Sequence, residues 1–73
     1  MEVNKGTYQH YKGPYYELLD IVYHSETEEP LVLYKPMYDT PNKEKRIWVR
    51  PYDMFFEMLE FKGKMVNRFA YVG

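Results

Sequence analysis

Within residues 47–56, Arg50 is the one side chain that packing does not account for. An arginine at the end of a predicted strand can pair through its forked guanidinium with a carboxylate of Glu26, Glu28 or Asp53, and so hold one end of the fold together. It can also present the guanidinium to a carboxylate or phosphate of a ligand. Both roles stay open, and the internal ion pair is favoured because acidic partners are predicted nearby.

Aromatic residues close to Arg50 indicate what kind of ligand such a site would take. Trp48, the only tryptophan, shares a strand face with Arg50 because side chains alternate along a strand. An arginine beside tryptophan, with Tyr34 or Tyr52 close, is typical of peptide-binding grooves and equally typical of a packed core. The candidate ligand-binding residues are His24, Glu26, Tyr34, Trp48, Arg50, Tyr52 and Arg68.

Catalytic and metal-binding patterns are poorly represented. Ser25 is the only serine, there is no cysteine, and the adjacent His24 projects to the opposite side of an extended backbone. His10, the other candidate base, lies far from Ser25 along the predicted strands. Asp20 and His24 are about 13 Å apart on a strand, which is too far for one metal ion. We therefore predict no catalytic residue, metal or cofactor, and a structural role for His24, hydrogen-bonded to a loop carbonyl or to Glu26.

The elements that would position these side chains are short strands, since apolar residues alternate along much of the chain. The first two strands are predicted at residues 6–11 and 15–24. The second is apolar on both faces and is interrupted by Asp20, which indicates a β-bulge. An acidic loop at residues 25–30 separates it from a third strand at residues 31–35.

The apolar spacing changes in the second half of the chain. A long loop at residues 38–45 and a fourth strand at residues 46–50 are followed by apolar residues at the helical spacing i, i+3, i+4 and i+7. Proline suits the first helical position because the N–H that it lacks would have no partner within the helix. Residues 51–55 are therefore predicted to form one helical or 3-10 turn. A hairpin turn at residues 62–64 then leads into a closing strand at residues 65–72.

Five or six short strands with one helical turn before the last hairpin predict a mainly β fold. We expect a small, strongly bent antiparallel barrel of SH3-like type, with Trp48 on its central strand and Met54 and Phe55 closing one end. The alternative is an α+β fold with a curved sheet and one helix. Residues 6–73 are expected to form a single domain after a flexible tail at residues 1–5.

Consecutive antiparallel strands would sort the charged residues by sign. Alternate connections lie at the same end of such a fold. One end is expected to collect the basic residues Lys12, Lys43, Lys45, Lys62 and Lys64. The other end is expected to collect Glu26, Glu28, Glu29 and Asp53. The basic end is either solvated surface or a contact for phosphate or an acidic partner.

Composition limits the classes of protein that the chain can belong to. A net charge of −1 does not favour a general nucleic-acid binder, and no apolar run approaches the length needed to span a bilayer. The lack of cysteine points to a reducing compartment, so we expect a soluble cytoplasmic protein. Nine tyrosines, four phenylalanines and one tryptophan supply much of the 45% hydrophobic content of this short chain. Some of these rings should lie at a surface, which predicts a monomer or a weak homodimer.

The chain resembles the small bacterial domain catalogued as domain of unknown function 1653. The resemblance runs from Tyr8 to Tyr71, and one position departs from it, since Asn67 stands where the family pattern has a proline. It rests on the segments Tyr8–Tyr16, His24–Thr27, Val32–Tyr34, Trp48–Phe55 and Arg68-Phe69. It implies a stand-alone bacterial domain and carries no catalytic residues.

The residues and the resemblance together favour a noncatalytic binding module that recognises a peptide, protein or nucleic-acid element. One alternative is a small-ligand-binding or enzymatic domain with a site around His24, Glu26 and Arg50. A purely structural or oligomerising domain is the other.

Overall fold

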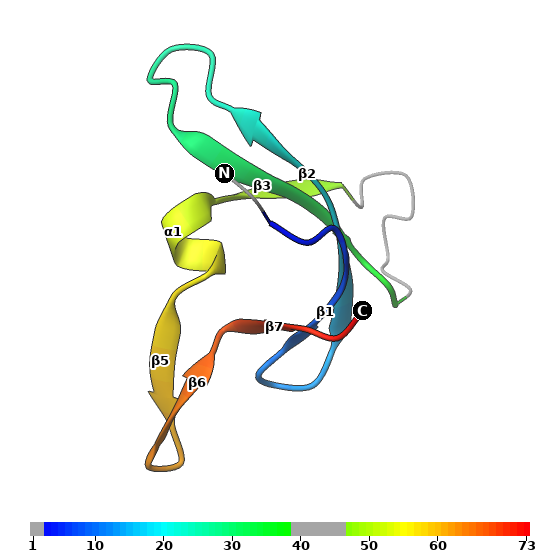
Figure 1. Cartoon of the computed structure of the whole chain (residues 1–73), viewed down its shortest axis with the longest axis vertical. Coiled ribbons are helices and arrows are strands. Elements are labelled where there is room, and N and C mark those ends of the chain that lie inside the picture. The colour runs from blue at the N-terminus through cyan, green and yellow to red at the C-terminus, as the bar shows by residue number, and fades with distance from the viewer. Residues whose placement is uncertain (1–2, 39–46) are drawn as a thin grey trace.

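The computed structural model describes residues 3–38 and 47–73, which form short strands and one helical turn (Figure 1). The elements are β1 (Gly6–His10), β2 (Tyr15–Tyr23), β3 (Pro30–Pro36), β4 (Trp48–Pro51), α1 (Tyr52–Phe55), β5 (Met58–Phe61), β6 (Lys64–Asn67) and β7 (Phe69–Tyr71). Within these residues, no helix is long and apolar enough to cross a membrane.

The strands form two antiparallel sheets. The larger sheet has the order β4-β3-β2-β1-β7, and β5 pairs with β6 in a separate hairpin. The prediction of a mainly β fold with one short helical turn is confirmed. The pairings among the described residues place β4 and β7 at the two margins of the larger sheet, so closure into an SH3-like barrel stays a prediction.

A β-bulge interrupts β2 where the sequence predicts it. Leu18 pairs with Tyr34 and Asp20 pairs with Leu33, so the intervening Leu19 has no partner in β3. One extra residue reverses the alternation of side chains along the strand. As a result Leu18 and Ile21, three residues apart, both face the core.

The predicted single closing strand at residues 65–72 is wrong, because it is divided at Arg68 into β6 and β7. The Arg68 N–H donates to the Glu57 carbonyl at 3.0 Å, and the Arg68 carbonyl accepts from the Tyr11 N–H at 3.0 Å. The backbone at Arg68 thereby leaves the hairpin and joins the larger sheet beside β1. Its two polar groups are satisfied at the crossing, which explains why the chain can turn there.

The helical turn α1 covers one face of the larger sheet. Pro51 stands immediately before it, and Phe55 points into the core with none of its surface exposed. Met54 was expected to point inward as well, but it is 45% exposed. Tyr52, Phe55 and Phe56 pack on the core, whereas Met54 lies on the exposed side of the turn.

The core is mostly aromatic. Phe55 of α1 stacks on Phe69 of β7 with ring centroids 4.1 Å apart. The six buried core residues in the described part of the chain are Tyr8, Leu18, Val32, Tyr34, Phe55 and Phe69. Trp48 is not among them: it was expected on a central strand, but β4 is a margin of the sheet and leaves Trp48 37% exposed.

Candidate functional site

Three aromatic rings lie together on the face of the sheet that carries the core. Trp48 of β4 pairs directly with Tyr34 of β3, and Tyr34 pairs with Leu18 two residues beyond Tyr16 in β2. The ring centroids are 6.0 Å apart for Trp48 and Tyr34, 5.7 Å for Tyr16 and Tyr34, and 6.4 Å for Tyr16 and Trp48. We call Tyr16, Tyr34 and Trp48 the aromatic floor. Tyr38 adjoins it, with its hydroxyl 3.2 Å from that of Tyr16.

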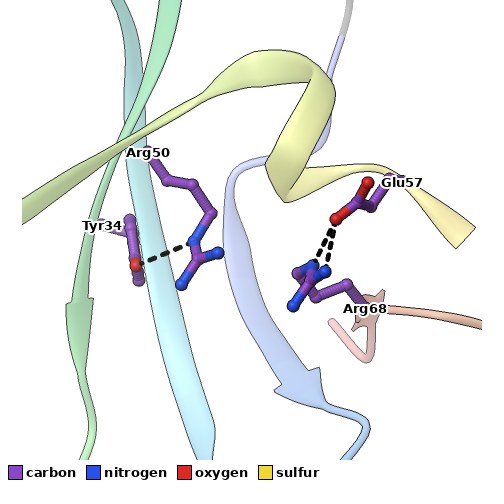
Figure 2. A network of polar contacts seen from close by, with 4 residues as sticks. All are labelled: Tyr34, Arg50, Glu57 and Arg68. Carbon is purple, nitrogen blue, oxygen red and sulfur yellow. Dashed lines mark hydrogen bonds and ion pairs between the residues drawn. The ribbon is translucent and has the colours of Figure 1, made fainter. Parts of the chain in front are cut away.

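Arg50 reaches over the margin of this floor. Its Nε donates to the Tyr34 hydroxyl at 3.3 Å, and its guanidinium carbon lies 5.5 Å from the centre of the Phe69 ring (Figure 2). The side chain is half-buried. Its partners are therefore a neutral phenol and a ring.

The expected ion pair between Arg50 and Glu26, Glu28 or Asp53 is not formed. Among residues 3–38 and 47–73, no carboxylate lies within ion-pair distance of the Arg50 guanidinium. The register explains this, because Arg50 lies opposite Val32 and its side chain shares the core face. It is thus directed toward Phe69 and away from the acidic loop.

Arg68 carries a second guanidinium toward the same region. Both its Nε, at 2.9 Å, and a terminal nitrogen donate to Oε1 of Glu57. Figure 2 shows Arg50 and Arg68 extending toward β1 from its two sides. Arg68 also fixes the crossing between β6 and β7, so its role is at least partly structural.

His10 of β1 lies within the electrostatic influence of both arginines. Burial lowers the pKa of the His10 imidazole, and the positive charges of Arg68, Arg50 and Lys12 lower it further. Its Nδ1 accepts a hydrogen bond from the Lys12 N–H at 3.1 Å, which also favours the neutral ring. From the sequence, His10 was recognised only as a possible base. Its proximity to the two arginines depends on how β7 packs beside β1, which the sequence does not show.

Tyr16 is held as a neutral phenol. Burial raises the pKa of the Tyr16 hydroxyl, and the hydrogen bond with Tyr38 and the nearby Tyr34 raise it further, while Arg50 acts in the opposite direction. The aromatic floor therefore offers rings and an uncharged hydroxyl beside a cation.

The other predicted site residues lie elsewhere. His24 accepts hydrogen bonds at Nδ1 from the N–H groups of Glu26 and Thr27, at 3.1 and 3.3 Å, in the exposed β2–β3 loop. His24 lies three residues beyond the level of Arg50, or about 10 Å along the strand direction. Tyr52 packs in α1 against Phe56, with ring centroids 4.8 Å apart. The structure thus brings together Tyr34, Trp48 and Arg50, places Arg68 nearby, and leaves His24, Glu26 and Tyr52 apart.

Part of the predicted basic end is assembled by an aromatic contact. Tyr11 beside the β1–β2 turn and Phe61 of β5 have ring centroids 5.1 Å apart. The Lys12 and Lys62 ammonium groups lie over these rings, at 5.7 and 5.3 Å from the centroids. Both turns lie toward the lower end of Figure 1, opposite the β2–β3 loop. Lys64 is exposed beside them at the start of β6, and Lys43 and Lys45 lie outside the described residues.

The fold and these contacts define a small, mainly β domain with a cation-flanked aromatic surface on one face of its sheet. The chain belongs to the family described as a protein of unknown function (DUF1653), whose model matches residues 6–71. It is similar to the crystal structure of a DUF1653 protein from Bordetella bronchiseptica, with 30% sequence identity and a TM-score of 0.90. That match covers 99% of this chain and 90% of the Bordetella chain. A comparison with curated proteins gave no match.

Proposed function

We propose that this domain is a noncatalytic binding module whose ligand presents a carboxylate or phosphate beside a flat unsaturated ring. The oxyanion binds Arg50, and the ring lies against Trp48 and Tyr16, the two rings of the aromatic floor that are not buried in the core. Its natural setting is the bacterial cytoplasm, which the lack of cysteine supports.

The observation that carries this proposal is the setting of the Arg50 guanidinium. Only its Nε donates a hydrogen bond to a described residue, the neutral Tyr34 hydroxyl. The two terminal nitrogens have the parallel geometry that binds carboxylate or phosphate through two hydrogen bonds. A half-buried position strengthens such a pairing because less water competes with the anion.

The floor supports the second half of the proposal. Trp48 and Tyr38 are 37% and 41% exposed, so part of each ring is accessible at the surface. Aromatic side chains of this kind contribute contact area at a low cost in conformational entropy, and they also stabilise a nearby guanidinium. The proposed site leaves out His24 and Glu26, which lie in the loop that follows the other end of β2.

A chemical-shift titration with three probes tests the proposal. Adenosine monophosphate supplies a phosphate beside a ring, N-acetyltryptophan supplies a carboxylate beside a ring, and inorganic phosphate supplies the anion alone. We expect the Trp48 indole N–H and the Arg50 Nε–H to shift with at least one ring-bearing probe, and the Trp48 shift to be smaller with phosphate alone. Unchanged signals at both groups with all three probes would contradict the proposal.

Arg50→Gln is the matching variant. Its amide can still donate to the Tyr34 hydroxyl, while the positive charge is lost. A hydrogen bond to a charged group contributes about 1.5–3 kcal/mol, so affinity should fall at least about tenfold. Lys35→Gln is the control, because it removes one positive charge from the opposite face, where Lys35 pairs with Glu17 at 3.7 Å. Equal affinities for the two variants would show that Arg50 does not bind the anion.

A further inference from the structure

We infer that the ligand of this module is single-stranded nucleic acid, laid across the strands from β4 to β5. This inference rests on the proposed function, since it assigns one phosphate to Arg50 and one base to the aromatic floor. It adds a direction and a length for the bound nucleic acid. The nucleic acid continues from Trp48 over the middle of the sheet to Phe61, beside the turns that carry Lys12 and Lys62.

The path follows a continuous row of rings that we call the aromatic band. It crosses successive elements, from β4 and β3 through β2 and β1 to the hairpin strand β5. The band consists, in order, of Trp48, Tyr16, His10, Tyr11 and Phe61, and successive ring centroids are 4.6 to 6.4 Å apart. Tyr34 is only 4% exposed and lies beneath the band in the core.

Cations stand at both ends of the band, and an arginine paired with Glu57 lies near its middle. Arg50 stands at the Trp48 end, and Arg68 lies close enough to His10 to lower its pKa. Lys12 and Lys62 lie over Tyr11 and Phe61 at the other end. A row of rings with cations at both ends matches a polymer that carries one base and one phosphate in every unit. An acidic peptide repeats charge without repeating rings, and a duplex turns its bases inward, so neither matches both the rings and the cations.

The net charge of −1 does not describe the local field at this band. Three glutamates, Glu26, Glu28 and Glu29, lie in the β2–β3 loop at the opposite end of β2. Along β2 the Lys12 end of the band lies about 30 Å from this loop, and the level of Arg50 lies about 10 Å from His24, whereas charges are screened over about 8 Å at physiological ionic strength. Glu57 offsets Arg68, which leaves Arg50, Lys12 and Lys62 as the uncompensated cations described along the band.

Fluorescence anisotropy with labelled oligonucleotides tests the inference. The probes are an eight-nucleotide single strand, a dinucleotide, a hairpin duplex and a glutamate-rich peptide of equal charge. We expect the octamer to bind at least tenfold more tightly than each of the other three. With three phosphate contacts, log K should fall with log salt at a slope of about −2. A peptide or duplex that binds more tightly than the octamer would overturn the inference.

Lys12→Gln and Lys62→Asn separate this inference from the proposed function. Each should weaken octamer binding and reduce the salt slope by about 0.7, while binding of adenosine monophosphate stays unchanged. Asparagine suits position 62 because Lys62 has a left-handed φ of 53°, so that variant keeps the hairpin. Lys35→Gln is again the control. Suppose that the octamer and the dinucleotide bind with equal affinity, and that both lysine variants bind the octamer as tightly as the wild type does. The assignment of single-stranded nucleic acid as the ligand then fails, although Arg50 still binds an anion. If Arg50→Gln binds adenosine monophosphate normally, the proposed function fails as well.

Discussion

Arg50 differs from an ordinary half-buried arginine in what its removal would leave behind. Deleting one partner of a buried ion pair leaves an uncompensated charge, which costs several kcal/mol. Here the described hydrogen-bond partner is the Tyr34 hydroxyl, so removal of the guanidinium leaves one neutral polar group. The fold therefore depends on Arg50 much less than an ion pair with Glu26, Glu28 or Asp53 would require. The ligand contact proposed for Arg50 requires this independence.

His10 provides a prediction about pH at the same scale. Burial and the charges of Arg68, Arg50 and Lys12 lower its pKa in the folded state below the ordinary 6.5, so the unfolded chain binds this proton more readily. The contribution of His10 to the free energy of unfolding is then fully present above about pH 6.5 and is lost as the pH falls toward the folded-state pKa.

The measurement is urea unfolding at pH 7.5 and pH 5.5, followed by Trp48 fluorescence. His10→Asn is the comparison, because its side-chain oxygen can still accept the hydrogen bond from the Lys12 N–H, which lies 3.1 Å from Nδ1 in the wild type. The wild type should lose more stability than His10→Asn on acidification. Identical losses would mean that His10 does not titrate with a lowered pKa.

Elements in this chain are joined by turns that need left-handed backbone. Lys62 and Gly63 have φ values of 53° and 80° and form the two-residue loop between β5 and β6. This is the arrangement of a type I′ hairpin, which matches the right-handed twist of the paired strands. In the β2–β3 loop the residue with positive φ is Glu28, at 61°. It is neither a glycine nor an asparagine, so this loop carries local strain.

Relieving that strain should stabilise the domain. Glu28→Asn should raise the free energy of unfolding by about 0.5–1 kcal/mol, because asparagine adopts the left-handed conformation more readily than glutamate. Glu26→Asn removes the same charge from the same loop at a residue whose φ is not positive, and it should change stability by less than about 0.5 kcal/mol. Urea unfolding of the two variants gives the comparison, and equal effects would assign any gain to charge.

At the scale of the whole molecule, the contact between α1 and the sheet is centred on Phe55. Phe55 is completely buried, and its ring packs against Tyr8, Tyr34, Phe56 and Phe69 at centroid distances of 4.1 to 5.5 Å. A 73-residue domain has a total stability of about 4–11 kcal/mol. A single large cavity at this position would therefore remove much of it.

Phe55→Ala should lower the free energy of unfolding by about 3–5 kcal/mol. Met54→Ala, one residue earlier and 45% exposed in the wild type, should lower it by less than about 1 kcal/mol. Urea unfolding followed by circular dichroism measures both. Similar losses for the two variants would show that the Phe55 contact is not what holds α1 on the sheet.

Local features of the fold could be predicted because they depend on neighbours in the chain. Alternating apolar residues and the Gly and Pro positions indicated the strands, and the interruption at Asp20 indicated the bulge between Leu18 and Asp20. The helical turn followed from Pro51 and the apolar spacing after it. The division of the last strand was missed because it depends on hydrogen bonds from Arg68 to Glu57 and Tyr11, which are distant in sequence.

The sequence by itself determined a mainly β chain with one helical turn and an aromatic core, since short-range alternation and composition specify these features. It also placed Trp48 and Arg50 on one strand face. Only the tertiary structure decided that Arg50 binds Tyr34 and Phe69, that β4 is a margin of the sheet, and that Tyr11 meets Phe61. These outcomes depend on strand register and on which ends of the two sheets meet, and the residue pairs that decide them are far apart along the chain.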